Sequence, residues 1–209
     1  YFQRQEEIDM ADCVYGGNKA NIKPGYIRYV DVNHDGEINS KDRVILGNST
    51  PRYEYSFTLG GQWKGIDLSL FFQGVGKRDL YYSGAGARPL VQNSTIFKSQ
   101  LDTWSPENPD AEYPLLLVDA GSTNMNNIVS SFWIKSGAYL RLKNLTVGYT
   151  LPKKWTNRVS IDNLRLYFTA SNLFTINNGY KGYDPETGVT SGAMYPVMKT
   201  FNFGINLDF

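Results

Sequence analysis

The sequence predicts an all-β fold of antiparallel strands, on the basis of its composition and its hydrophobic pattern. Aromatic residues make up 14% of the 209 residues and are accompanied by 20 glycines, which favours strands joined by flexible loops. Apolar and polar residues alternate with a period of two in several stretches. The longest apolar run, 115–118, is far shorter than the roughly 18 residues of a membrane-spanning helix, whereas a membrane-spanning strand needs only about 9 to 11 alternating residues. Transmembrane helices are therefore excluded, and transmembrane strands are not.

A β-hairpin is predicted over 53–73. In its first half the odd positions are aromatic or aliphatic apart from one glycine, and the even positions are small or polar. Lys64 and Gly65 then provide a tight turn between two alternating runs. The second run alternates again, so the hairpin has one apolar face and one polar face.

A long stretch rich in Asn, Ser, Pro and Gly follows from 74 to about 130. Loops of this length are uncommon in compact domains unless they carry function. The alternation returns over 139–151, where Arg141 and Lys143 share the parity of the apolar residues. Either a bulge near Asn144 shifts the phase, or the two charges lie beyond the apolar zone.

Two further strands are predicted at 164–171, after a connection led by Pro152, and at 201–209, after another long loop. A soluble sandwich would pack the apolar face inward, whereas an outer-membrane barrel would turn it toward lipid. The barrel is favoured because the strands approach ten residues, short and very long connections alternate, and aromatic residues cluster at the strand ends. About five strands cannot close a barrel, and unpaired edges are not viable in lipid, so further strands must come from a missing segment or a separate polypeptide.

Several longer stretches carry a more specific signal than the alternation does. They are 104–114 (WSPENPDAEYP), 139–152 (YLRLKNLTVGYTLP), 172–175 with 179–186 (NLFT and GYKGYDPE), and 195–209. In this order they resemble motifs near the C-terminal end of the SusC/RagA family of TonB-dependent outer-membrane transporters. One position departs from the family pattern, because Leu115 stands where the family usually places an Arg.

The resemblance implies an importer with an N-terminal plug inside a large antiparallel transmembrane barrel of about 22 strands with long extracellular loops. The chain would supply the last five or so strands, with 1–52 as an extracellular loop region and 53–209 as C-terminal barrel strands and their loops. Implied partners are the plug and upstream strands of the same transporter, a SusD-like surface lipoprotein acting as a lid, TonB through the N-terminal part that this chain lacks, and outer-membrane lipid. The implied location is the outer membrane of a Gram-negative cell, and the implied substrates are glycans or peptides.

The topology follows if the last strand ends at the periplasmic rim. The Lys64–Gly65 turn and the 152–163 connection are then periplasmic, and the stretches 74–138 and 175–197 are extracellular, as expected of barrels with short inner turns and long outer loops. Strand parity predicts the side chains that face lipid: Phe57, Leu59, Leu68, Leu70, Leu166, Phe168, Phe203 and Ile205.

A calcium-loop pattern, D-x-[DN]-x-[DN]-G with an acidic residue at its twelfth position, is present between 31 and 42. Oxygens on alternate residues can converge on one ion because the glycine permits a sharp turn, and the residue after that glycine would bind through its backbone carbonyl. The alternative is a solvated Asx turn without metal. The candidate calcium ligands are Asp31, Asn33, Asp35, Glu37 and Asp42.

The remaining features argue against catalysis and nucleic-acid binding. The net charge is +1, so no strong field attracts nucleic acid. His34 is the only histidine and Cys13 the only cysteine, which leaves no support for a histidine-based triad and permits no internal disulfide. The sequence therefore predicts a non-enzyme. The alternative to the importer segment is a secreted, calcium-stabilised β module that binds a polymer or a partner protein.

Overall fold

The computed structural model describes residues 1–84, 96–117, 125–157, 160–177, 179, 184–187 and 195–209. Contacts divide the chain into two units, one built from Tyr1–Gly47 and Tyr81–Ile134, the other from Asn48–Leu80, Lys135–Val189 and Met194–Phe209. The sequence-based division at 52/53 stays a prediction. Residues 180–183 of the family-like motif lie outside the described residues.

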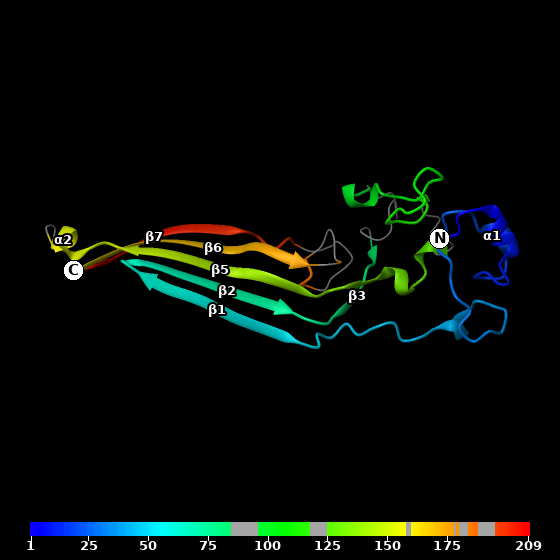
Figure 1. Cartoon of the computed structure of the whole chain (residues 1–209), viewed down its shortest axis with the longest axis horizontal. Helices are drawn as coiled ribbons and strands as arrows, with labels where there is room; N and C mark the ends of the chain where they lie inside the picture. The colour runs from blue at the N-terminus through cyan, green and yellow to red at the C-terminus, as the bar shows by residue number, and fades with distance from the viewer. Residues whose placement is uncertain (85–95, 118–124, 158–159, 178, 180–183, 188–194) are drawn as a thin grey trace. The chain divides into compact units, whose positions relative to one another are not determined.

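The second unit contains a five-stranded antiparallel sheet in the order β1-β2-β5-β6-β7 (Figure 1). Each strand pairs with the next long strand along the chain, so the sheet is a meander, and the predicted number of strands is confirmed. The strands are β1 (Glu54–Trp63), β2 (Ile66–Val75), β5 (Tyr139–Thr150), β6 (Asn163–Asn177) and β7 (Thr200–Asp208).

The turn between β1 and β2 has the backbone geometry that a two-residue hairpin requires. Lys64 and Gly65 both adopt positive φ, at 49° and 86°. Positive φ at both central residues matches the twist of the flanking strands, and glycine adopts it without steric cost. The predicted hairpin is therefore confirmed, with Trp63 opposite Ile66.

A bulge in β5 resolves the parity conflict of its two basic residues. Phe71 of β2 pairs with Asn144, but the next residue of β2 pairs with Leu142, so Lys143 is the additional residue. The insertion moves Arg141 to the face that carries Gln73, its partner on β2. Of the two explanations that the sequence allowed, the bulge is correct.

The register lines up the apolar residues of all five strands on one face. Phe57 pairs with Phe72 and stacks on it at a ring-centroid distance of 4.9 Å, and Phe168 pairs with Phe203 at 5.0 Å. These side chains join no buried core cluster among the described residues, and Phe203 is 84% exposed. All eight residues that parity assigns to the apolar face are paired in register on that face.

The first unit has a small core of its own. Phe2, Ile8, Val14, Ile22 and Tyr26 are buried together. Its helices are short: α1 (Gln5–Met10) and the 3₁₀ turns Lys19–Asn21, Ser40–Asp42, Lys98–Gln100, Met125–Asn127 and Ser131–Trp133.

Two further strands, β3 (Asp79–Tyr81) and β4 (Ile134–Ser136), form a separate two-stranded sheet. Within the described residues, every helix is too short or too polar to span a bilayer.

Candidate functional site

The face of the five-stranded sheet opposite the apolar one is mainly polar, with Phe71 of β2 as an apolar exception. Adjacent strands place polar or small residues in cross-strand rows, such as Ser69, Thr146, Thr169 and Asn202. Hydrogen bonds cross these rows, for example from Asn202 Nδ2 to Thr169 Oγ1 at 3.4 Å. One sheet thus separates an apolar surface from a surface that can line a water-filled path.

An ion pair lies on this polar face near the end of the sheet that carries the β1–β2 turn. Arg165 donates through Nε and Nη2 to the two carboxylate oxygens of Asp67, at 2.9 and 2.6 Å. Gly148 lies between the two, and a Cβ at that position would collide with the Asp67 carboxylate and lie 2.5 Å from Arg165 Nη2. The bidentate pair therefore requires a glycine at position 148 of β5, because a side chain there would occupy the space of the pair.

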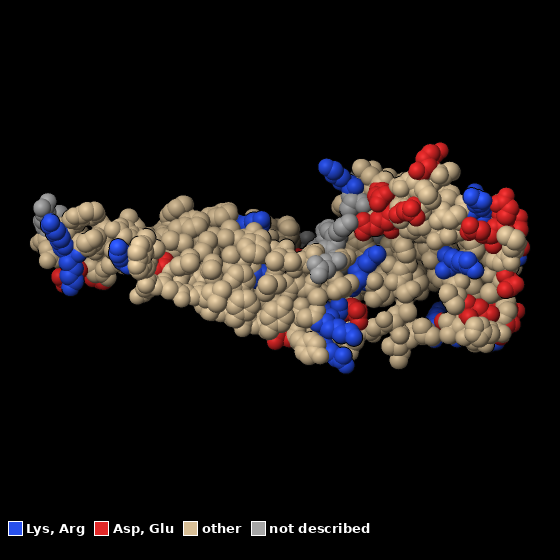
Figure 2. All heavy atoms as spheres, in the orientation of Figure 1, with Lys and Arg blue, Asp and Glu red and all other residues tan. Residues whose placement is uncertain are grey.

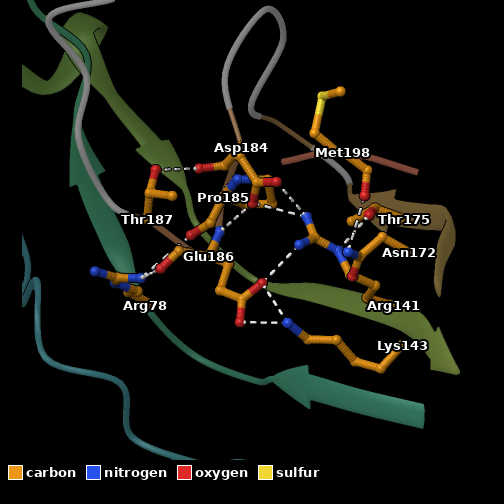
Figure 3. Close-up of polar contacts among 10 residues, drawn as sticks. All are labelled: Arg78, Arg141, Lys143, Asn172, Thr175, Asp184, Pro185, Glu186, Thr187 and Met198. Carbon is orange, nitrogen blue, oxygen red and sulfur yellow. Dashed lines mark hydrogen bonds and ion pairs between the residues drawn. The ribbon is translucent and has the colours of Figure 1, made fainter. Parts of the chain in front are cut away.

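A larger polar network, the Arg141 cluster, lies at the other end of the sheet and consists of Arg141, Lys143, Asp184 and Glu186 (Figure 3). Arg141 is 2% exposed and donates to Thr175 Oγ1 at 2.7 Å, to Glu186 at 2.6 Å and to both oxygens of Asp184 at 2.6–2.7 Å. Lys143 donates to both oxygens of Glu186 at 2.6 and 2.8 Å.

The cluster fixes the segment 184–187 against β5. Besides the side-chain pairs, Arg78 donates through Nη1 to the backbone carbonyls of Pro185 and Glu186, at 3.2 and 3.5 Å. The Glu186 N–H in turn donates to Asp184 at 2.9 Å (Figure 3). Three cations thus hold a short acidic segment, and charge-assisted hydrogen bonds of this kind are about twice as strong as neutral ones.

The predicted calcium loop folds back on its own side chains. The Asp31 carboxylate accepts hydrogen bonds from the N–H groups of His34 at 2.7 Å and Gly36 at 2.9 Å. The Asp42 carboxylate accepts from the N–H groups of Val32 at 2.9 Å and Asn39 at 2.7 Å. These bonds give the loop a defined conformation in which the carboxylates of Asp31 and Asp42 face its backbone.

The predicted ligands of this loop are brought together in two groups. Asp42 lies beside Asp31, and Asn33 Nδ2 donates to Asp35 at 3.0 Å. Glu37 was predicted to bind through its backbone carbonyl, and its side-chain carboxylate accepts a hydrogen bond from Asn39 Nδ2 at 3.4 Å. Across the described residues no group of three or more His, Cys, Asp or Glu side chains is arranged to hold a metal ion, and the calcium site stays a prediction.

Backbone hydrogen bonds lower the pKa values of two carboxyl groups in the loop. The pKa of Asp42 lies below its usual value chiefly because the Asn39 N–H donates to it. The pKa of Asp35 is lowered chiefly by the Glu37 N–H, with a smaller contribution from Lys41, whose Nζ lies 3.5 Å away. Both carboxylates are therefore charged at neutral pH and able to attract a cation.

A pocket of about 950 Å³ borders the loop within the first unit. Its lining is mainly apolar and includes Val30, Val44 and Val129, together with three tyrosines. The hydroxyl of one of them, Tyr29, donates to the backbone carbonyl of Met125, and burial raises its pKa. The tyrosine hydroxyl is thus satisfied within the chain.

Sequence reasoning found the polar face but missed the two ion-pair sites on it. Of the aromatic residues in the long connections, Trp104, Tyr113 and Trp133 are buried and pack the first unit, whereas Tyr195 is 80% exposed. A signal for the Arg141 cluster did exist, because Arg141 breaks the apolar parity of its strand and therefore needs a partner.

The comparisons with known proteins agree on one group of receptors. No protein-family model matches the sequence. TonB-dependent receptor P3 of Formosa agariphila is 33% identical over 89% of this chain and 19% of its own length. TonB-dependent receptor SusC of Bacteroides thetaiotaomicron is 29% identical over 90% of the chain and 18% of its own length. The chain spans about a fifth of the length of the curated relatives that it matches.

Solved structures give the same result for the fold. The RagAB peptide importer in its open-open state superimposes with a TM-score of 0.60 at 29% identity, over 79% of this chain and 18% of that one. The five strands are thus part of a transmembrane barrel, as the apolar face and the open sheet edges require. The chain is therefore a SusC/RagA-like C-terminal section of a TonB-dependent receptor, and its location is the outer membrane of a Gram-negative cell.

Proposed function

We propose that the chain forms a section of the wall of an outer-membrane importer, with its polar face lining the substrate path. The observation that carries this proposal is the division of one sheet into an apolar face and a mainly polar face across all five strands. A soluble β module would cover its apolar face, whereas Phe203 on this face is 84% exposed. The relatives are receptors and an importer, so the proposal includes no enzymatic step.

The proposed substrates are peptides or glycans, and the proposed partners are TonB, a SusD-like lipoprotein lid and the remaining parts of the same receptor. The RagAB neighbour is a peptide importer, which supports a peptide for this chain as well. The TonB-dependent relatives support coupling to TonB through a part of the receptor outside this chain. The polar face offers hydroxyl and amide groups that can hydrogen-bond either class of substrate.

Uptake by cells that produce the whole receptor tests this function. Thr169→Trp places a bulky side chain on the polar face in the middle of β6, and Phe168→Trp places the same side chain on the apolar face one residue away. With equal amounts of receptor at the cell surface, we expect Thr169→Trp to reduce the uptake rate of labelled oligopeptides several-fold and Phe168→Trp to leave it unchanged. Equal uptake by both variants would show that the path does not follow this face, and labelled oligosaccharides tried in parallel identify the substrate class.

We also propose that the loop 31–42 holds one calcium ion through Asp31, Asn33, Asp35, the Glu37 carbonyl and Asp42. The proximity of the Asp31 and Asp42 carboxylates supports this, because calcium prefers carboxylate oxygens as ligands. Calcium should then raise the unfolding temperature of the wild-type receptor but not that of the double variant Asp31→Asn/Asp42→Asn.

The matched control for the calcium test is Asp12→Asn/Asp110→Asn, which removes two exposed carboxylates outside the loop. We expect this control to keep the wild-type response to calcium. A wild-type receptor whose unfolding temperature is insensitive to calcium after treatment with a chelator would contradict the site.

A further inference from the structure

The turn between β1 and β2 places a tryptophan and a lysine at the margin of the apolar face. Trp63 is the last residue of β1, has the parity of the apolar face and is 69% exposed. The ammonium group of Lys64 lies 4.6 Å from the centroid of the Trp63 ring. A cation is thereby held where the apolar surface ends.

The connection between β5 and β6 brings a second group of the same kind to the same end of the sheet. The Thr150 N–H donates to the carbonyl of Gly65 at 2.8 Å, which ties the end of β5 to the β1–β2 turn. The short helix α2 (Lys153–Thr156) follows at this end of the sheet (Figure 1), and it contacts β6. Lys153 and Lys154 are exposed, and Trp155 is 58% exposed.

The connection presents these side chains from a well-bonded backbone. Thr156 is the buried residue of the single helical turn, so the other three side chains point outward. The Trp155 N–H donates to the carbonyl of Pro152 at 2.9 Å, and the Ile161 N–H donates to that of Thr156 at 3.2 Å. The space-filling view shows blue basic atoms gathered at the end that carries α2, next to the tan surface of the strands (Figure 2).

The three lysines of this end have no anionic partner in the structure as far as it describes the chain. The ion pairs among the described residues do not include Lys64, Lys153 or Lys154. The carboxylates at this end belong to Asp67, which Arg165 binds, and to Asp162 and Asp208 on the β6–β7 side, where the Asp208 carboxylate accepts a hydrogen bond from Asn163. Three ammonium groups therefore remain for an external anion.

The arrangement fits the boundary between acyl chains and phosphates of a lipid leaflet. Indole rings favour this boundary, and lysines just beyond an apolar surface reach phosphate groups. We propose that Trp63, Lys64, Lys153, Lys154 and Trp155 form a binding surface for phospholipid headgroups, with an anionic glycerophospholipid such as phosphatidylglycerol as the preferred ligand. A zwitterionic headgroup carries its own cation, which weakens its attraction to three lysines. The inference rests on the outer-membrane location and not on the proposed transport.

The test measures lipid binding by the whole receptor that contains this chain, purified in a nonionic detergent. Native mass spectrometry with added phosphatidylglycerol or phosphatidylethanolamine gives the apparent Kd for each lipid. Each lysine near an anionic surface contributes about fivefold to affinity, so Lys64→Gln/Lys153→Gln/Lys154→Gln should weaken phosphatidylglycerol binding by about a hundredfold. The corresponding triple Arg variant keeps the charge and should bind like wild type.

A control with the same loss of charge uses lysines away from this end, as Lys77→Gln/Lys98→Gln/Lys199→Gln, and should keep wild-type affinity. If the triple Gln variant does not fold, the wild-type receptor gives an independent measurement. The wild-type affinity for phosphatidylglycerol should exceed that for phosphatidylethanolamine at least tenfold, and it should fall as the salt concentration rises. Equal loss in the control variant, equal wild-type affinity for the two phospholipids, or tighter wild-type binding of a lipid A phosphate would overturn the proposal.

Discussion

Replacing Arg141 by Met should release the segment 184–187 from β5. The guanidinium group is almost completely buried and supplies the hydrogen bonds that hold Asp184, together with one of those that hold Glu186. Removing one member of a buried ion pair costs about 3–5 kcal/mol, because its partners stay charged and lose their hydrogen bonds. Since both carboxylates are partly exposed, the lower value applies, and about 3 kcal/mol corresponds to an increase of about a hundredfold in the open population.

Thiol labelling measures this opening. In a receptor carrying Cys13→Ser and Thr187→Cys, the rate of modification by a maleimide follows the opening equilibrium when closing is fast. We expect Arg141→Met to raise the labelling rate by about a hundredfold. Arg141→Lys should also raise it strongly, because an ammonium group cannot reproduce the two-pronged geometry of the guanidinium.

Lys143→Met is the matched control, since Lys143 contacts only Glu186 within the cluster and is itself partly exposed. Its loss should cost at most about 1 kcal/mol, or roughly fivefold in rate. Labelling of Arg141→Met at the wild-type rate, or at the rate of Lys143→Met, would refute the assignment of Arg141 as the anchor.

Three further changes test the sheet and the loop. Gly148→Ala should lower the free energy of unfolding in urea by about 1–3 kcal/mol because its Cβ collides with the ion pair above it, whereas Gly61→Ala, with open space around it, should not share this penalty. Phe203→Arg should cost about 2–4 kcal/mol if the side chain lies near the bilayer midplane, and unfolding of receptor reconstituted in lipid vesicles measures this. The Asn39 N–H lowers the pKa of Asp42 from 3.8, so the hydrogen-bonded loop is stabilised above pH 3.8 and loses this stabilisation as the pH falls through the lowered pKa. Exchange of the Asn39 amide hydrogen, corrected for its intrinsic pH dependence, should therefore accelerate only in that acidic range. Asp42→Asn should abolish this acceleration.

The strand arrangement was predictable because period-two alternation places alternate side chains on opposite faces of a strand. The pairing of Leu59 with Leu70 follows from parity and the two-residue turn, and parity places Phe168 and Phe203 on the same face. The tight turn followed from two residues, Lys64 and Gly65. Local sequence therefore contains most of the information for the sheet.

The Arg141 cluster was not predictable in the same way. Its acidic members lie 43 and 45 residues along the chain from Arg141, in a loop with no periodicity. The choice of partner depends on how that loop returns to the sheet, and this return is decided by tertiary contacts such as those of Arg78. Which loop aromatics are buried, as Trp104 and Trp133 are, also depends on tertiary packing, because loops carry no periodic pattern.

Because of the bulge at Lys143, the effect of losing one residue from β5 depends on the position of that residue in the strand. Because Lys143 is the extra residue, deleting it would leave a regular strand in which Leu142 keeps the apolar face and Arg141 keeps the polar face. In variant receptors, deletion of Lys143 should therefore be tolerated better than deletion of a paired residue of β5 such as Thr146, which would turn Leu145 toward the polar path.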